Sequence, residues 1–174
     1  YGGPLMDLGV HIIDIAWLLM GKPIPKKVDG KVFRKLGPEM AGIAGDYDKY
    51  DVEDLACGSV QFENGAFMTV ETSYILNGCQ DVFEVELMGT KGGLVWPKLL
   101  YTSLGKGGPN RCELPYTDES LASVNELKHF VECIVNDSDT IVPLNDSKEV
   151  ISIIEDMYKS AIDEKTVDRG NYEI

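Results

Sequence analysis

Hydrophobic residues near the start of the chain recur every three or four positions, which is the spacing of one face of a helix. They are Leu5, Leu8, Ile12, Ile15, Ala16 and Leu19. This pattern predicts a helix from Leu5 to Met20. Gly21 is expected to end the helix, because glycine readily adopts the left-handed backbone of a helix C-terminus, and Pro23 just beyond cannot continue it.

The hydrophobic period changes to two from Val52 onward, which predicts β-strands. The expected strands are Leu55–Phe62, Ala66–Tyr74, Val82–Met88, Leu94–Trp96 and Leu99–Ser103. Asn64-Gly65 lies between the first two, and this dipeptide favours a tight hairpin turn. Short connections without helices predict an antiparallel meander. One face of the meander mixes Thr, Glu and Ser with apolar residues, so we expect that face to meet solvent or a partner.

The remaining segments complete an α+β pattern. Val28–Leu36 is a candidate strand, and Gly37–Tyr50 reads as an acidic loop. Two amphipathic helices are expected near the end of the chain, at Glu119–Val135 and Ser147–Ile162. The order helix, strands, helices predicts one α+β domain, with helices packed on one face of a largely antiparallel open sheet.

Composition narrows the possible partners. The chain has 174 residues, of which 44% are hydrophobic, and a formal net charge of −13. An acidic surface repels phosphate backbones and anionic lipid surfaces, so we expect no nucleic-acid or membrane binding. Apolar runs are too short to cross a bilayer. The cysteines, at positions 57, 79, 112 and 133, lie far apart, a pattern typical of reduced thiols in a cytoplasmic protein.

Asp7, His11 and Asp14 form the most distinctive polar group in the sequence. At about 100° per residue, the three positions fall within an arc of roughly 60° on an otherwise apolar helix. A carboxylate one turn from a histidine can fix its tautomer and raise its basicity, which suits a general base. A solvated or internally hydrogen-bonded stripe explains the same spacing equally well. A metal triad of two carboxylates and one histidine is a weaker alternative. His129 is expected to be solvated.

The glycine-rich segments do not predict a nucleotide site. Gly105–Asn110 has Asn where a dinucleotide fingerprint needs its last glycine, and no helix is expected after it. We therefore interpret it as a loop. Gly89–Gly93 is interpreted as a hairpin connection. We expect no cofactor and no metal to be bound by this chain.

Ordered motifs run along most of the chain, beginning with residues 2–14, GGPLMDLGVHIID. This segment resembles the G-G-x-x-x-D-x-G-x-H-x-x-D segment of the glucose–fructose oxidoreductase/inositol dehydrogenase (Gfo/Idh/MocA) family. Four shorter segments follow in the family's order: residues 51–54 (DVED), 62–66 (FENGA), 88–93 (MGTKGG) and 158–161 (YKSA).

The resemblance implies the C-terminal domain of a two-domain NAD(P)-dependent oxidoreductase, with residues 1–174 lacking the N-terminal Rossmann cofactor domain. In that pattern Asp7 and His11 match the catalytic residues, and Asp14 matches a position that contacts polyol substrates. The family's lysine lies in the cofactor domain. NAD or NADP would be bound by that other domain, and the chain by itself would be inactive.

The resemblance also implies a sugar, cyclitol or similar polyol as substrate. It further implies a homodimer or higher even homo-oligomer formed through the sheet. A non-catalytic module that mediates assembly or binds a partner on the same fold is the alternative.

Overall fold

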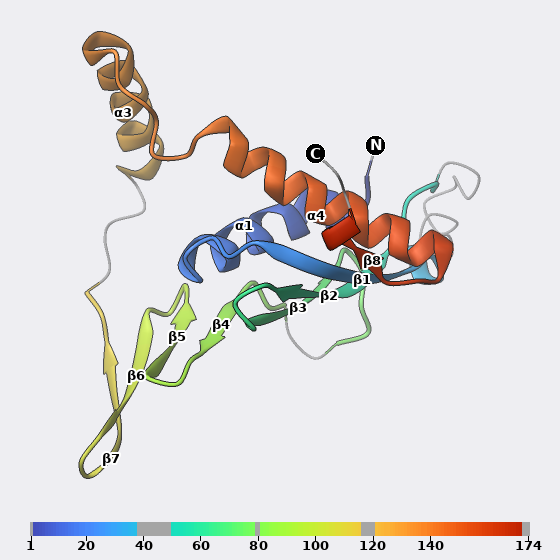
Figure 1. Cartoon of the computed structure of the whole chain (residues 1–174), viewed down its shortest axis with the longest axis horizontal. Coiled ribbons are helices and arrows are strands. Elements are labelled where there is room, and N and C mark those ends of the chain that lie inside the picture. The colour runs from blue at the N-terminus through green and yellow to red at the C-terminus, as the bar shows by residue number, and fades with distance from the viewer. Residues whose placement is uncertain (1, 38–49, 79–80, 116–120, 172–174) are drawn as a thin grey trace. The chain divides into compact units, whose positions relative to one another are not determined.

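A four-stranded antiparallel sheet forms the framework of the first of two units into which the chain divides (Figure 1). The computed structural model describes residues 2–37, 50–78, 81–115 and 121–171. The first unit comprises residues 1–83 and 149–174, and the second comprises residues 84–148. Most of the predicted loop Gly37–Tyr50 lies outside the described residues.

The first sheet has the strand order β3-β2-β1-β8. Its strands are β1 (Pro25–Phe33), β2 (Leu55–Phe62), β3 (Phe67–Ser73) and β8 (Val167–Asp168). The alternation read from the sequence is confirmed, since one face carries buried residues and the other is open. The buried residues of β2 and β3 are Ala56, Val60, Phe62, Met68, Val70 and Thr72.

Helices cover the buried face of this sheet. They are η1 (Leu5–Gly9), which is a π-helix, α1 (Val10–Leu19) and the part of α4 (Leu144–Asp163) that starts at Glu149. A Cβ atom at Gly30 would lie 2.2 Å from the backbone oxygen of Met157. The Gly30 amide donates a 3.0 Å hydrogen bond to Oγ of Ser160. Glycine in β1 therefore lets the backbone of α4 approach the sheet directly.

The second unit holds a separate four-stranded antiparallel sheet, in the order β4-β5-β6-β7. The strands are β4 (Val85–Met88), β5 (Gly92–Trp96), β6 (Leu100–Gly105) and β7 (Gly108–Glu113), and α3 (Ala122–Asn136) follows. The interpretation of Gly105–Asn110 as a loop is wrong, because Gly108 begins β7 and pairs with Gly105. The turn itself is tighter than predicted, with Gly108 at φ +116°.

The predicted α+β class is confirmed, and so are all three predicted helices, within a few residues at their ends. The helix predicted over Leu5–Met20 begins with one π-helical segment before the α-helical part. Gly21, at φ +82°, ends it as expected. In the described ranges, no helix combines the length and apolarity that a membrane span requires.

Candidate functional site

The polar stripe of the first helix faces away from the core. The buried residues of η1 and α1 are Leu5, Gly9, Ile13, Ala16 and Trp17. Asp7 and His11 are exposed, and Asp14 is half-buried. Short π-helical turns inserted into α-helices occur frequently at functional sites. Here the π-helix contains Asp7, so its wider turn changes the angular offset between Asp7 and His11 from the α-helical value used in the sequence argument.

Asp7 is held by a residue from the sheet. The hydroxyl of Tyr74, which directly follows β3, donates a 2.8 Å hydrogen bond to Oδ2 of Asp7. Partial burial, this hydrogen bond and the negative charges of Asp7 and Glu53 raise the pKa of Tyr74 to about 12. Tyr74 is therefore a neutral donor at physiological pH, and it fixes one oxygen of the Asp7 carboxylate.

Sequence reasoning missed Tyr74 as a site residue. Tyr74 was included in the predicted strand Ala66–Tyr74, but its partner lies 67 residues away. The alternation of the strand is the signal that could have pointed to Tyr74. Residues 72 and 74 share a face of the strand, and Thr72 lies against the first helix, where its Cγ2 atom would be 3.3 Å from a Cβ atom added at Gly9.

His11 is exposed, and in the described part of the chain neither of its ring nitrogens has a hydrogen bond or ion pair to Asp7 or Asp14. An exposed imidazole whose nitrogens are unpaired can accept a proton from a bound molecule. Asp7, one helical turn earlier, supplies a negative charge on the same side of the helix.

Two buried carboxylates support the loop and helix around this stripe. Oε1 of Glu53 accepts hydrogen bonds from the Leu5 amide, at 3.2 Å, and from the Tyr158 hydroxyl, at 2.7 Å. Oδ2 of Asp54 accepts hydrogen bonds from the amides of Lys35, Leu36 and Gly37, at 2.5, 2.7 and 2.9 Å. Both acidic residues at the end of the DVED segment therefore have a structural role, because each accepts hydrogen bonds that hold a neighbouring part of the chain.

The other histidine does not join the stripe. His129 is half-buried on α3, and its Nε2 atom accepts a 3.1 Å hydrogen bond from the Ile141 amide. Its ring also contacts Sγ of Cys133. The expectation that His129 is simply solvated is wrong, because its ring holds the segment that follows α3 against that helix.

The described residues contain no group of three or more His, Cys, Asp or Glu side chains arranged to hold a metal ion. The glycine-rich turn between β6 and β7 leads into a strand. A dinucleotide pyrophosphate is bound at a glycine loop that opens a helix, so this turn does not fit that group.

Comparison with known proteins agrees with this architecture. Residues 1–168 match the family described as "Oxidoreductase family, C-terminal alpha/beta domain" (GFO_IDH_MocA_C). The chain is 38% identical over 106 residues to D-glucoside 3-dehydrogenase of Escherichia coli (strain K12), a match that covers 58% of this chain and 30% of that protein.

Solved structures share the fold. One is aldose-aldose oxidoreductase from Caulobacter crescentus complexed with glycerol, with a TM-score of 0.73, 23% identity, and coverage of 96% of this chain and 48% of that one. Another is levoglucosan dehydrogenase in complex with NADH and L-sorbose, with a TM-score of 0.77, 21% identity, and coverage of 93% and 49%. The chain thus spans about half the length of these solved proteins.

Proposed function

The chain belongs to the Gfo/Idh/MocA oxidoreductase family, as its C-terminal α/β domain, and from that membership we propose that it forms the substrate side of an NAD(P)-dependent dehydrogenase. Its substrate is a hydroxyl group of a sugar, a cyclitol or a similar polyol. A dinucleotide-binding domain outside this sequence completes the enzyme. A non-catalytic module on the same fold is the alternative.

The names of the relatives support a carbohydrate substrate. One is a D-glucoside 3-dehydrogenase, and the solved structures hold glycerol or L-sorbose. A strongly acidic chain is also better suited to a neutral polyol than to an anionic substrate, which its net charge of −13 would repel.

The hydrogen bond from Tyr74 to Asp7, beside the exposed His11, is the observation that carries the proposal. Oxidation of a carbinol requires that hydride leave the carbon while a base removes the hydroxyl proton. The nicotinamide ring, held by the other domain, supplies the hydride acceptor. His11 accepts the hydroxyl proton, and Asp7 stabilises the imidazolium that forms. Asp14, half-buried on the same helix, orients further hydroxyl groups of the substrate.

The histidines provide the test of this proposal. In the two-domain protein we expect His11→Ala to lower turnover on the order of 10²–10⁴-fold, the usual effect of losing a general base. His129→Ala is the matched control, because His129 is hydrogen-bonded to the Ile141 amide on α3. It should lower the melting temperature and leave turnover per folded molecule near normal. A fully active His11→Ala variant would favour the non-catalytic alternative.

Cofactor binding is assigned to the other domain. We expect the 174-residue chain by itself to show no saturable binding of NAD(H) or NADP(H) in calorimetric titration. Micromolar affinity in that titration would contradict this division of the site.

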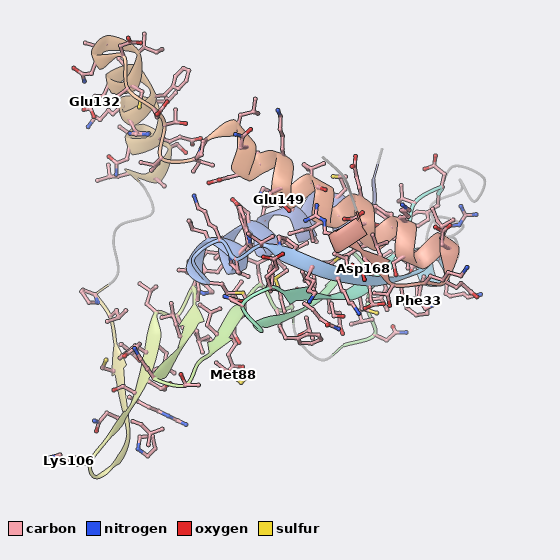
Figure 2. The ribbon with its side chains drawn as sticks, viewed as in Figure 1. Phe33, Met88, Lys106, Glu132, Glu149 and Asp168 are labelled. Atoms are coloured by element: carbon pink, nitrogen blue, oxygen red, sulfur yellow. The ribbon has the colours of Figure 1, made fainter. Side chains whose placement is uncertain are left out.

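The open face of the first sheet suits a second copy of the chain. Phe33 and Phe67 lie on it with 42% and 57% of their surface exposed, on strands β1 and β3 (Figure 2 labels Phe33). Thr69 and Glu71 lie on the same face of β3, beside the partly exposed Cys57 of β2. Exposed aromatic groups with polar neighbours are typical of protein contacts, so we propose a homodimer or higher even oligomer through this face.

A further inference from the structure

Gly3, Glu53 and Tyr158 meet at the first turn of the helix that carries Asp7. Glu53 precedes β2 and is only 9% exposed, and Tyr158 is half-buried on α4. Glu53 is separated from Leu5 by 48 residues and from Tyr158 by 105 residues. Two of the motifs quoted from the sequence, DVED (residues 51–54) and YKSA (residues 158–161), therefore meet at the start of the opening motif, residues 2–14.

A single oxygen makes both connections. Oε1 of Glu53 accepts the Leu5 amide and the Tyr158 hydroxyl. Burial, the hydrogen bond to Glu53 and the negative charge of Glu53 raise the pKa of Tyr158, so its hydroxyl remains a donor. The Leu5 amide is one of the first N–H groups of the helix, which have no acceptor within it. The carboxylate satisfies that amide and lies at the positive end of the helix.

The glycine at position 3 is required by this arrangement. A Cβ atom there would lie 2.5 Å from both Cδ and Oε2 of Glu53. Contacts that short force a displacement, so a side chain at position 3 would push the carboxylate away from Leu5. The second glycine of the GG pair therefore makes room for the buried carboxylate.

Asp7 is directly connected to the anchored residues. The backbone oxygen of Gly3 accepts 3.1 Å hydrogen bonds from the amides of Met6 and Asp7. The backbone of Asp7 is thus fixed through Gly3, which packs on Glu53, while its side chain is fixed by Tyr74. A shift of the Glu53 carboxylate would move the backbone of Asp7, and the hydrogen bond between Tyr74 and Asp7 would then have to lengthen or change its angle.

We propose that Glu53 and Tyr158 are positioning residues for Asp7: together they hold the first π-helical turn in the place that lets the Asp7 carboxylate support His11. The proposal rests on the proposed function, in which His11 takes the substrate proton. Neither Glu53 nor Tyr158 touches the substrate, and both act through the backbone of residues 3–7.

Tyr158→Phe in the two-domain protein tests the positioning role, with Tyr50→Phe as its matched control. The Tyr50 hydroxyl donates to the backbone oxygen of Glu53, at 3.3 Å, and leaves the carboxylate alone. For Tyr158→Phe we expect kcat to fall about tenfold with the sugar KM within about twofold, because a small misplacement of a catalytic group acts mainly on the reacting geometry. Tyr50→Phe should leave both kcat and KM unchanged.

Glu53→Gln is the second variant, because its amide oxygen can still accept from both Leu5 and Tyr158. We expect kcat to stay within about threefold of the unmodified protein. A loss in Glu53→Gln as large as the tenfold expected for Tyr158→Phe would overturn the role of this oxygen.

His11→Ala, measured in the same series, separates the two ideas. If His11→Ala is inactive while Tyr158→Phe changes only the melting temperature, the positioning role is overturned and the proposed function stands. If His11→Ala is fully active, the proposed function itself fails. Loss of kcat in His11→Ala and in Tyr158→Phe, with the sugar KM kept in Tyr158→Phe and kcat kept in Tyr50→Phe, supports both.

Discussion

The Tyr74 hydroxyl donates a hydrogen bond of 2.8 Å to Oδ2 of Asp7, joining the end of β3 to the π-helical turn η1. The bond requires a protonated phenol, and the pKa of Tyr74 is raised to about 12, above the 10.0 of an ordinary tyrosine. A group whose pKa is raised on folding contributes stability below its unfolded pKa and loses that contribution as the pH rises through its folded pKa.

We therefore predict that unfolding becomes easier as the pH rises from 10 to 12, in part through Tyr74. Tyr74→Phe should flatten this part of the pH dependence, because phenylalanine does not titrate. Urea unfolding of both proteins at a series of pH values measures the difference. Identical slopes for the two proteins between those pH values would show that the Tyr74 hydroxyl carries no such linkage.

Asp7→Asn keeps the shape of the side chain and removes its charge. In the two-domain protein we expect a lower kcat, because the imidazolium that forms when His11 takes the substrate proton loses its nearby negative charge. Asp146→Asn on α4 is a control, since Asp146 lies in the other unit. A normal kcat in Asp7→Asn would contradict a catalytic role of Asp7.

A prediction about assembly concerns Phe67, which is 57% exposed on the open face of the first sheet. Phe67→Glu should convert the expected homodimer to monomer, because a buried unpaired carboxylate at an interface is costly. Ile162→Glu, on α4 and 77% exposed, is the matched control and should leave the assembly intact. Light scattering at tens of micromolar checks both, and a strictly monomeric starting protein would refute the interface.

Thr72 provides a prediction about stability. Its side chain is 4% exposed, and its Oγ1 atom has no hydrogen-bond partner among the described residues. Thr72→Val removes the unpaired hydroxyl at nearly the same shape, so we expect stabilisation of about 1 kcal/mol. Thr72→Ser keeps the hydroxyl and loses the methyl group that packs near Gly9, so it should destabilise. Thermal unfolding of the two variants gives the sign of each effect.

Local pattern was enough to predict the elements that form the framework. Strands β2 and β3 were visible because every second residue is apolar, and their turn was visible in Asn64-Gly65. There Gly65 has φ +83° and the Ala66 amide donates to Oδ1 of Asn64. Asp7 and His11 were visible as polar residues on an apolar helix. The structure places both side chains at the surface, and their catalytic role stays a prediction.

Other features were out of reach because their causes lie far apart in the chain. Strand β7 contains Pro109 and follows a run of glycines, so it lacks the usual strand composition and forms through backbone pairing with β6. Strand β8 has only two residues and exists because it pairs with β1. The roles of Glu53 and Tyr74 depend on partners 48 or more residues away, which hydrophobic periodicity cannot reveal.

The hydrogen bond between Tyr158 and Glu53 also sets an order on how the site is assembled during synthesis. Residues 5–19 are translated well before Tyr158, whose hydroxyl completes the anchor and which lies 105 residues after Glu53. Contacts of such long sequence separation form late, because they must wait for the intervening chain. A nascent chain that ends before α4 therefore contains Asp7 and His11 without the side chain that anchors their helix. Asp7 and His11 are therefore translated early in this chain but reach their final positions only after α4 has been made.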